Sequence, residues 1–191
     1  MATPAAPAER KVRTWLPTLV ILGIVLFVVF GGYVVAGALS SETGPPLEVG
    51  NAVTVSPLTG WEVARRGPVT GGGEFAELTR GTGSLDVFTT STTLSPEDLL
   101  RTYVNEFLKP NAQQLSVSEE INQVQLDNGM SAVRASYVGT FGDRHSQIEG
   151  EVTALVTPSG QGVVFDGWGP AGLYPYAQGD VDTMIRAAEV Q

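Results

Sequence analysis

The chain has 191 residues, of which 42% are hydrophobic, and this length suits one domain with appended segments. It contains no cysteine and a single histidine, His145, which excludes disulfides, thiolate nucleophiles, cysteine-bound metal centres and multi-histidine metal sites. From Ser40 onward there are 19 acidic and 8 basic residues, a formal charge of −11. An acidic surface of this kind argues against binding to nucleic acid or to anionic lipid headgroups.

An apolar segment near the N-terminus predicts a membrane-spanning helix. Residues 15–39 contain no charged side chain, and at about 1.5 Å per residue they can cross a hydrocarbon core about 30 Å thick. Three basic residues precede the segment, and the first charge after it is Glu42. The positive-inside rule therefore predicts a plasma-membrane protein with a cytoplasmic N-terminus and an extracytoplasmic C-terminal part. A signal peptide cleaved near Ala38 is the alternative, although its apolar region usually has only about 7–15 residues.

The rest of the chain divides into three regions. Residues 1–14 are predicted as a cytoplasmic tail, disordered where Ala and Pro dominate. Residues 40–50 are predicted as a linker stiffened by Pro45-Pro46. Residues 51–191 are then expected to form a single extracytoplasmic domain.

The first half of this domain predicts strands followed by one long helix. Four strand-like runs are separated by turn residues: 52–56, 61–66, 74–80 and 84–92. Residues 96–109 carry apolar side chains at helical spacing, which predicts an amphipathic helix facing the core. Ser95 suits its N-cap and Pro96 its first turn, and Lys109-Pro110 is expected to end it.

Residues 121–168 predict a four-stranded antiparallel meander, with a short helix at 181–190 after it. Two-residue turns are expected at Asn128-Gly129, Gly142-Asp143 and Gly160-Gln161. These turns would pair Val124 with Val133, Tyr137 with Ile148, Arg134 with Glu151, and Val156 with Phe165. Because side chains alternate along a strand, one face would collect apolar residues against the helix: Val124, Leu126, Val133, Ala135, Tyr137, Phe141, Ile148, Val152, Ala154, Val156, Val163 and Phe165. The other face is expected to be polar, becoming mixed near Leu155, Val164 and Trp168.

The polar residues give little support to catalysis. A serine hydrolase would need His145, which is expected on a strand end in solvent. Glu149 and Glu151 share one strand face, and an ion pair of Glu151 with Arg134 explains them more simply than acid–base chemistry or cation binding. Asp180 and Asp182 are expected to cap the final helix. No catalytic residue, metal or cofactor is therefore expected.

The segment Phe165–Asp180 carries the candidate binding residues Trp168, Tyr174 and Tyr176. Aromatic side chains with polar tips suit protein interfaces. The simpler explanation is a lid that closes the sheet edge. A division is predicted, in which Trp168 is mainly structural while Tyr174 and Tyr176 lie closer to the surface.

The order of strands, one long helix, an antiparallel meander and a final helix resembles the PsbP-like fold. The residues that carry this resemblance are "LTGWEV", "SPEDLLRTYVNEFL", "LDNGMSAVRASYVGTFGDRHSQIEGEVTALVTPSGQGVVFDGW" and "DVDTMIRAAEV". The likeness implies an α+β domain, an α/β/α sandwich of an antiparallel sheet with helices packed on it. It extends to actinobacterial LpqN-type envelope lipoproteins, from which this chain departs because a membrane helix replaces the lipidated cysteine.

Members of this fold mostly act as adaptors or assembly factors, and this analogy is of fold alone. We therefore expect a non-enzymatic single-pass membrane protein that serves as an adaptor or accessory subunit of an envelope or membrane complex, with a protein partner. The alternative is a carrier of a small apolar or lipid ligand, which would need a closed apolar cavity of roughly 300 Å³ or more.

Overall fold

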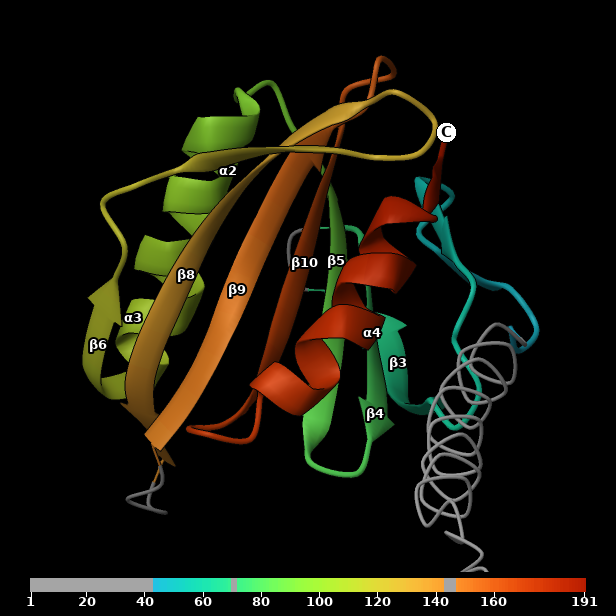
Figure 1. Cartoon of the computed structure of the whole chain (residues 1–191). Coiled ribbons are helices and arrows are strands. Elements are labelled where there is room, and N and C mark those ends of the chain that lie inside the picture. Colours follow the sequence, from blue (N-terminus) through green and yellow to red (C-terminus); the bar gives the residue numbers. More distant parts are fainter. Residues whose placement is uncertain (1–42, 70–71, 143–146) are drawn as a thin grey trace, which may run out of the picture. The chain divides into compact units, whose positions relative to one another are not determined.

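The computed structural model describes residues 43–69, 72–142 and 147–191 (Figure 1). The predicted membrane helix at 15–39, the tail at 1–14 and His145 lie outside these residues. Within them, no helix has both the length and the apolar character needed to cross a membrane.

Most strands form one eight-stranded sheet in the order β3-β4-β5-β10-β9-β8-β6, and β7 also pairs with β8. All of these pairings are antiparallel. The bounds are β3 Glu62–Pro68, β4 Glu74–Arg80, β5 Gly83–Ser91, β6 Ala112–Val117, β7 Asn122–Gln125, β8 Ser131–Phe141, β9 Gln147–Val156 and β10 Gln161–Pro170. A small second sheet has the order β1-β2-β11, with bounds Leu47–Val49, Val53–Val55 and Glu189–Val190. The predicted meander, β7 to β10, is therefore confirmed.

Helices cover both faces of the large sheet. Helix α2 (Pro96–Tyr103) continues through a π-helical turn, η1 (Val104–Leu108), into α3 (Lys109–Asn111), and α4 (Pro175–Arg186) follows β10. Figure 1 shows α4 in front of β5 and β10, and α2 behind β8. Alternate residues of β10 belong to two separate cores, since Val164 packs with α2 whereas Phe165 packs with α4. This arrangement confirms an α+β domain in which helices pack on an antiparallel sheet.

The long helix begins where the sequence predicts. The Ser95 side chain accepts a hydrogen bond from the Asp98 backbone N–H, at 3.1 Å, as an N-cap does. The helix does not stop at Lys109, because α3 carries it to Asn111. Pro110 lacks an N–H, and in a regular α-helix its ring would collide with the carbonyl four residues earlier. The wider turn η1 just before it is consistent with that steric demand.

The last hairpin differs from the prediction by three residues. Val156 pairs with Gly162 rather than with Phe165. The connection is a three-residue loop, in which the Thr157 N–H bonds to the Gln161 carbonyl and Gly160 has φ of 80°. An odd shift moves every side chain to the other face. The prediction that Val163 and Phe165 share the α2 face is therefore wrong.

The first hairpin of the meander is shifted by one residue for the same reason. Val124 pairs with Ala132 instead of Val133, and the loop ends at Gly129, whose φ is 84°. Leu126 consequently belongs to the core beneath α4, although it was predicted on the α2 face. Both connections have three residues and end on a left-handed glycine, the three-residue hairpin with a bulge.

The middle hairpin, β8–β9, is shifted by two residues. Tyr137 pairs with Gly150 rather than Ile148. An even shift keeps each side chain on its predicted face, and the residues of these two strands that were predicted to face α2 do pack with it. Thr153, and not Glu151, is the direct partner of Arg134.

Three further boundaries need correction. β1 lies inside the predicted linker 40–50, and Leu47 and Val49 are buried, so the packed domain begins before residue 51. β6 and β11 were not predicted. The final helix begins at Pro175 rather than 181, because proline fits the first turn of a helix, while residues 189–190 form β11 instead of helix.

Candidate functional site: an aromatic groove beside a row of carboxyl groups

Four aromatic rings gather where α2 and η1 meet β4 and β5. Phe88 of β5 is central, with ring centroids 4.8 Å from Phe75, 5.3 Å from Tyr103 and 5.1 Å from Phe107. Tyr103 and Phe107 stack on each other at 5.1 Å. The helix places both on one side, four residues apart. Phe107 remains 43% exposed, which is unusual for a large apolar ring in such a cluster.

Three of these rings, those of Phe88, Tyr103 and Phe107, border a surface groove of about 330 Å³ between the helix and β5. Its lining includes Phe88, Thr90, Leu99, Tyr103, Glu106 and Phe107. Glu106 and Phe107 are exposed, so the groove opens to solvent along η1. We refer to it as the aromatic groove. Exposed aromatic residues over a partly desolvated hollow are the usual anchors of recognition sites.

A row of three carboxyl groups crosses the sheet next to the groove. Glu77 of β4 pairs with Asp86 of β5, and Asp86 pairs with Asp166 of β10, so all three side chains point to one face. At the outer end, Arg65 of β3 donates to Glu77 at 2.5 Å. We call Glu77, Asp86 and Asp166 the carboxyl row. Phe75 and Phe88 lie two residues from Glu77 and Asp86 on the same strand faces, which connects the row to the groove.

Hydrogen bonds fix the inner part of the row. Tyr103 and Tyr137 each donate a hydroxyl to Asp166, at 2.9 Å. Trp168 donates its indole N–H to Oδ2 of Asp86 at 3.0 Å, while Oδ1 is buried with no hydrogen-bond partner in the described part of the chain. Tyr103 thus takes part in both features, because its ring lines the groove and its hydroxyl holds Asp166.

Burial favours the neutral form of these acids. Burial, reinforced by the neighbouring Asp166 charge, raises the pKa of Asp86 to about 7. Burial also raises the pKa of Asp166 to about 6, although the two tyrosine hydroxyls act in the opposite direction. Burial followed by the Asp166 charge raises the pKa of Tyr103, so this hydroxyl stays a donor. Between about pH 6 and pH 7, Asp86 and Asp166 together therefore hold about one proton.

Replacing Tyr103 with phenylalanine should lower the free energy of unfolding by about 1.5–3 kcal/mol, because it removes a hydrogen bond to an ionisable buried group. Tyr174→Phe is the matched control, since the Tyr174 hydroxyl is buried and has no hydrogen-bond partner within the described residues. Its loss should leave stability unchanged or slightly increased. Urea unfolding of both variants measures the difference, and equal losses would contradict the role given to the Tyr103–Asp166 bond.

The three aromatic residues predicted as binding candidates do not form one surface. Trp168 is half-buried in the α2 core and is bonded to Asp86. Tyr174 is only 4% exposed and packs in the other core, so its predicted place near the surface is wrong. Tyr174 packs on β10, because Gly167 of that strand has no side chain and leaves room for the Tyr174 hydroxyl. Tyr176, at the start of α4, is 86% exposed.

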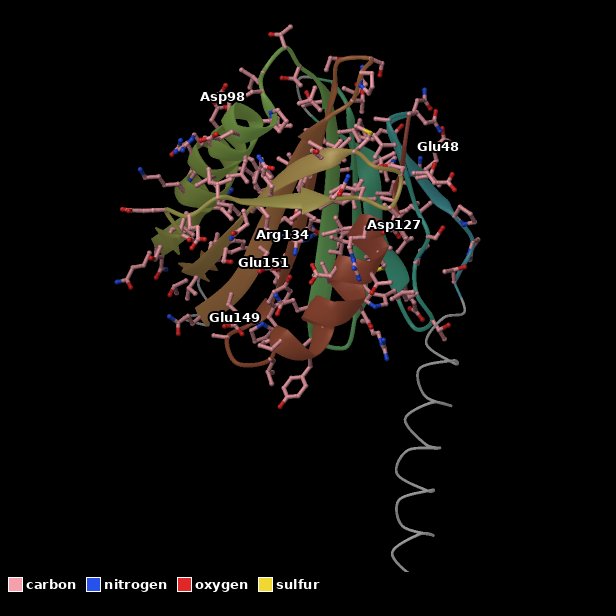
Figure 2. All side chains as sticks on the ribbon, turned by 45° about the horizontal axis from the view of Figure 1, so that its top comes forward. Glu48, Asp98, Asp127, Arg134, Glu149 and Glu151 are labelled. Carbon is pink, nitrogen blue, oxygen red and sulfur yellow. The ribbon has the colours of Figure 1, made fainter. Side chains whose placement is uncertain are left out.

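The polar residues noted in the sequence join α4 to the sheet. Arg134 donates to Glu151 at 3.4 Å, so the predicted ion pair exists (Figure 2). It also donates to a second acid, Asp182 of α4, at 2.5 Å. Asp180 forms an ion pair with Arg80 and accepts from the Trp61 indole N–H at 3.0 Å. The expectation that the two aspartates cap the final helix is wrong, because both lie inside α4.

Sequence reasoning missed the groove and the row. Tyr103 and Phe107 were assigned only to the buried stripe of a helix, and Asp166 stood unremarked in the apolar run "VVFDGW". The signal in the sequence was this single carboxylate within an apolar strand, because a buried charged group needs partners that the fold must supply. Among residues 43–69, 72–142 and 147–191, no group of three or more His, Asp or Glu side chains is arranged to hold a metal ion.

No protein-family model matches the chain, and no curated protein sequence matches it. Among solved structures it is similar to cyanobacterial PsbP (CyanoP) from Synechocystis sp. PCC 6803, with 15% sequence identity and a TM-score of 0.49. That match covers 74% of this chain and 88% of the other.

Proposed function

We propose that this chain is a non-enzymatic, single-pass membrane protein of the PsbP-like, LpqN-type class, acting as an adaptor or accessory subunit of an envelope or membrane complex. Residues 15–39 would anchor it in the plasma membrane, with the N-terminus in the cytoplasm and the described domain outside. The single observation that carries the proposal is the aromatic groove with its exposed Phe107.

Binding accounts for the site better than catalysis does. The inner carboxyl groups are held by tyrosine and tryptophan donors and by burial, and Glu77 is held by Arg65. Groups engaged in this way support the sheet instead of facing a substrate. The exposed ring of Phe107, in contrast, is free to enter a partner's surface, and a few aromatic residues of this kind often supply most of the binding energy of an interface.

A carrier of a small apolar ligand is the second candidate, because the groove volume of about 330 Å³ is near the lower end of small-molecule sites, roughly 300–1,000 Å³. A carrier normally encloses most of its ligand's surface. This groove has exposed residues along η1, which favours a partner that covers it from outside.

The test is purification of the full-length protein in mild detergent, followed by mass spectrometry of co-purifying proteins and lipids. Phe107→Ala should reduce recovery of the partner by about tenfold or more, since a hot-spot aromatic contributes about 2 kcal/mol. Tyr176→Ala, which removes a ring that is even more exposed but lies elsewhere, at the start of α4, is the control and should keep the partner. Melting curves check that both variants fold.

The other outcomes decide between the alternatives. Recovery of a bound lipid in place of a protein, lost in Phe107→Ala, would favour the carrier. Loss of a protein partner only in Tyr176→Ala would move the recognition surface to α4 and the segment predicted from sequence. Unchanged recovery in both variants would contradict the groove as a binding site.

A further inference from the structure

We propose that the partner segment in the aromatic groove is a basic, amphipathic polypeptide. It would place one apolar side chain against Phe88 and Phe107 and a lysine or arginine beside Glu106. This inference rests on the proposed function, because it specifies the chemistry of the partner that the groove receives.

The first argument is an uncompensated charge at the groove. Glu106 lines the groove and is exposed, and it forms no ion pair or side-chain hydrogen bond with the described residues. The arginines of β3 and α2 are already engaged: Arg65 with Glu77, Arg66 with Glu74, and Arg101 with Glu97. Lys109 of α3 is exposed but does not belong to the lining. The groove thus presents a negative charge that forms no ion pair with a cation of residues 43–69, 72–142 or 147–191.

The second argument is the charge behind the groove. The carboxyl row places three acids beside Phe75 and Phe88. One cation, Arg65, pairs with the row, through Glu77. The pair Asp86–Asp166 carries about one negative charge near neutral pH, given pKa values of about 7 and 6. The excess of 19 acidic over 8 basic residues from Ser40 onward adds a long-range negative field. Such a field raises the association rate of positively charged partners.

The apolar part of the groove indicates a polypeptide instead of a simple cation. The rings of Phe88, Tyr103 and Phe107 line the groove and supply the contact area that an aliphatic or aromatic anchor would bury. An amphipathic segment combines this anchor with a cation at a fixed spacing, as in groove-binding peptides. Nucleic acids and anionic lipids are disfavoured, since both bring negative charge to a negative surface.

The experiment uses the full-length protein in mild detergent, immobilised and challenged with a displayed library of random dodecapeptides. Synthetic copies of the enriched peptides are then titrated against wild type, Glu106→Lys, Glu48→Lys and Phe107→Ala. Glu48 is an exposed acid on β1. The residues on either side of it, Leu47 and Val49, pack in the core that contains α4, whereas α2 belongs to the other core. Glu48→Lys therefore changes the net charge by the same amount without touching the groove (Figure 2).

Enriched peptides should be net positive and contain an aromatic or aliphatic anchor. Glu106→Lys should weaken their binding by about tenfold or more, the effect of about 1.4 kcal/mol, and Glu48→Lys by less than about twofold at moderate salt. Equal losses in the two charge variants would show bulk attraction and overturn the inference. Neutral or acidic peptides that still need Phe107 would also overturn it, while leaving the groove as a binding site. If binding never depends on Phe107, the proposed function itself fails.

Discussion

Arg134→Ala should lower the free energy of unfolding by about 2–4 kcal/mol, one of the two largest effects expected in this protein. The Arg134 side chain is 13% exposed and makes three contacts that join β8, β9 and α4. Its Nε donates to Thr153 at 2.7 Å, and its Nη1 reaches Glu151 and Asp182. Removing the cation leaves two acids close together, 17% and 33% exposed, without a counter-charge.

Arg101→Ala is the control for this prediction. Arg101 also pairs with an acid, Glu97, but the two side chains are 59% and 52% exposed on α2. Exposed pairs at this helical spacing contribute about 0.3–0.5 kcal/mol. Denaturant unfolding of both variants provides the comparison, with the free energy of unfolding falling at the same slope against denaturant concentration in each. Similar losses in the two would mean that the Arg134 network is solvated and does not hold α4 to the sheet.

Raising the pH from about 5 to about 8 should lower the free energy of unfolding by about 4 kcal/mol through the carboxyl row. Asp86 and Asp166 have folded-state pKa values of about 7 and about 6, whereas an unfolded aspartic acid has a pKa of about 3.9. The folded state binds more protons across this interval. The stabilisation is thus complete below about pH 4 and is lost as the pH rises through the two folded values.

Asp86→Asn isolates the contribution of Asp86 to this pH-dependent loss of stability. The amide oxygen can still accept the Trp168 N–H, and the amide N–H₂ provides a donor at the position of Oδ1, as the protonated acid does. The variant should lose less than half as much stability as wild type between the two pH values and should be the more stable protein at about pH 8. Chemical denaturation at several pH values measures this. If the free energy of unfolding falls equally with pH in the two proteins, the ionisation of Asp86 does not destabilise the folded state.

Local sequence patterns were enough for the main elements of the domain. Ser95 and Pro96 mark the start of α2 because capping chemistry acts within one turn of helix. The alternation in Glu74–Arg80 predicts β4 with its observed bounds. The short strands β1 and β11 escaped notice, since three and two residues are too few for a period.

The candidate site could not be predicted in the same way. Phe88, Tyr103 and Phe107 come from a strand and a helix, and their ring contacts arise only when α2 packs on the sheet. Exposure also depends on packing, as Tyr174 and Tyr176 show: both are tyrosines at the start of α4, but one is 4% and the other 86% exposed. Aromatic composition alone does not distinguish an anchor in the core from one on the surface.

By itself, the sequence determined the apolar segment 15–39, the acidic character of the rest, the order of most elements and the antiparallel meander. These properties depend on composition and on side-chain periods that neighbouring residues set. The tertiary structure decided which face of β10 meets α2, because one residue more or less in a hairpin loop reverses every side chain. It also decided the carboxyl row. Glu77 meets Asp86 through the pairing of β4 with β5, but Asp166 joins them only through the pairing of β5 with β10, although Asp86 and Asp166 are 80 residues apart in the chain.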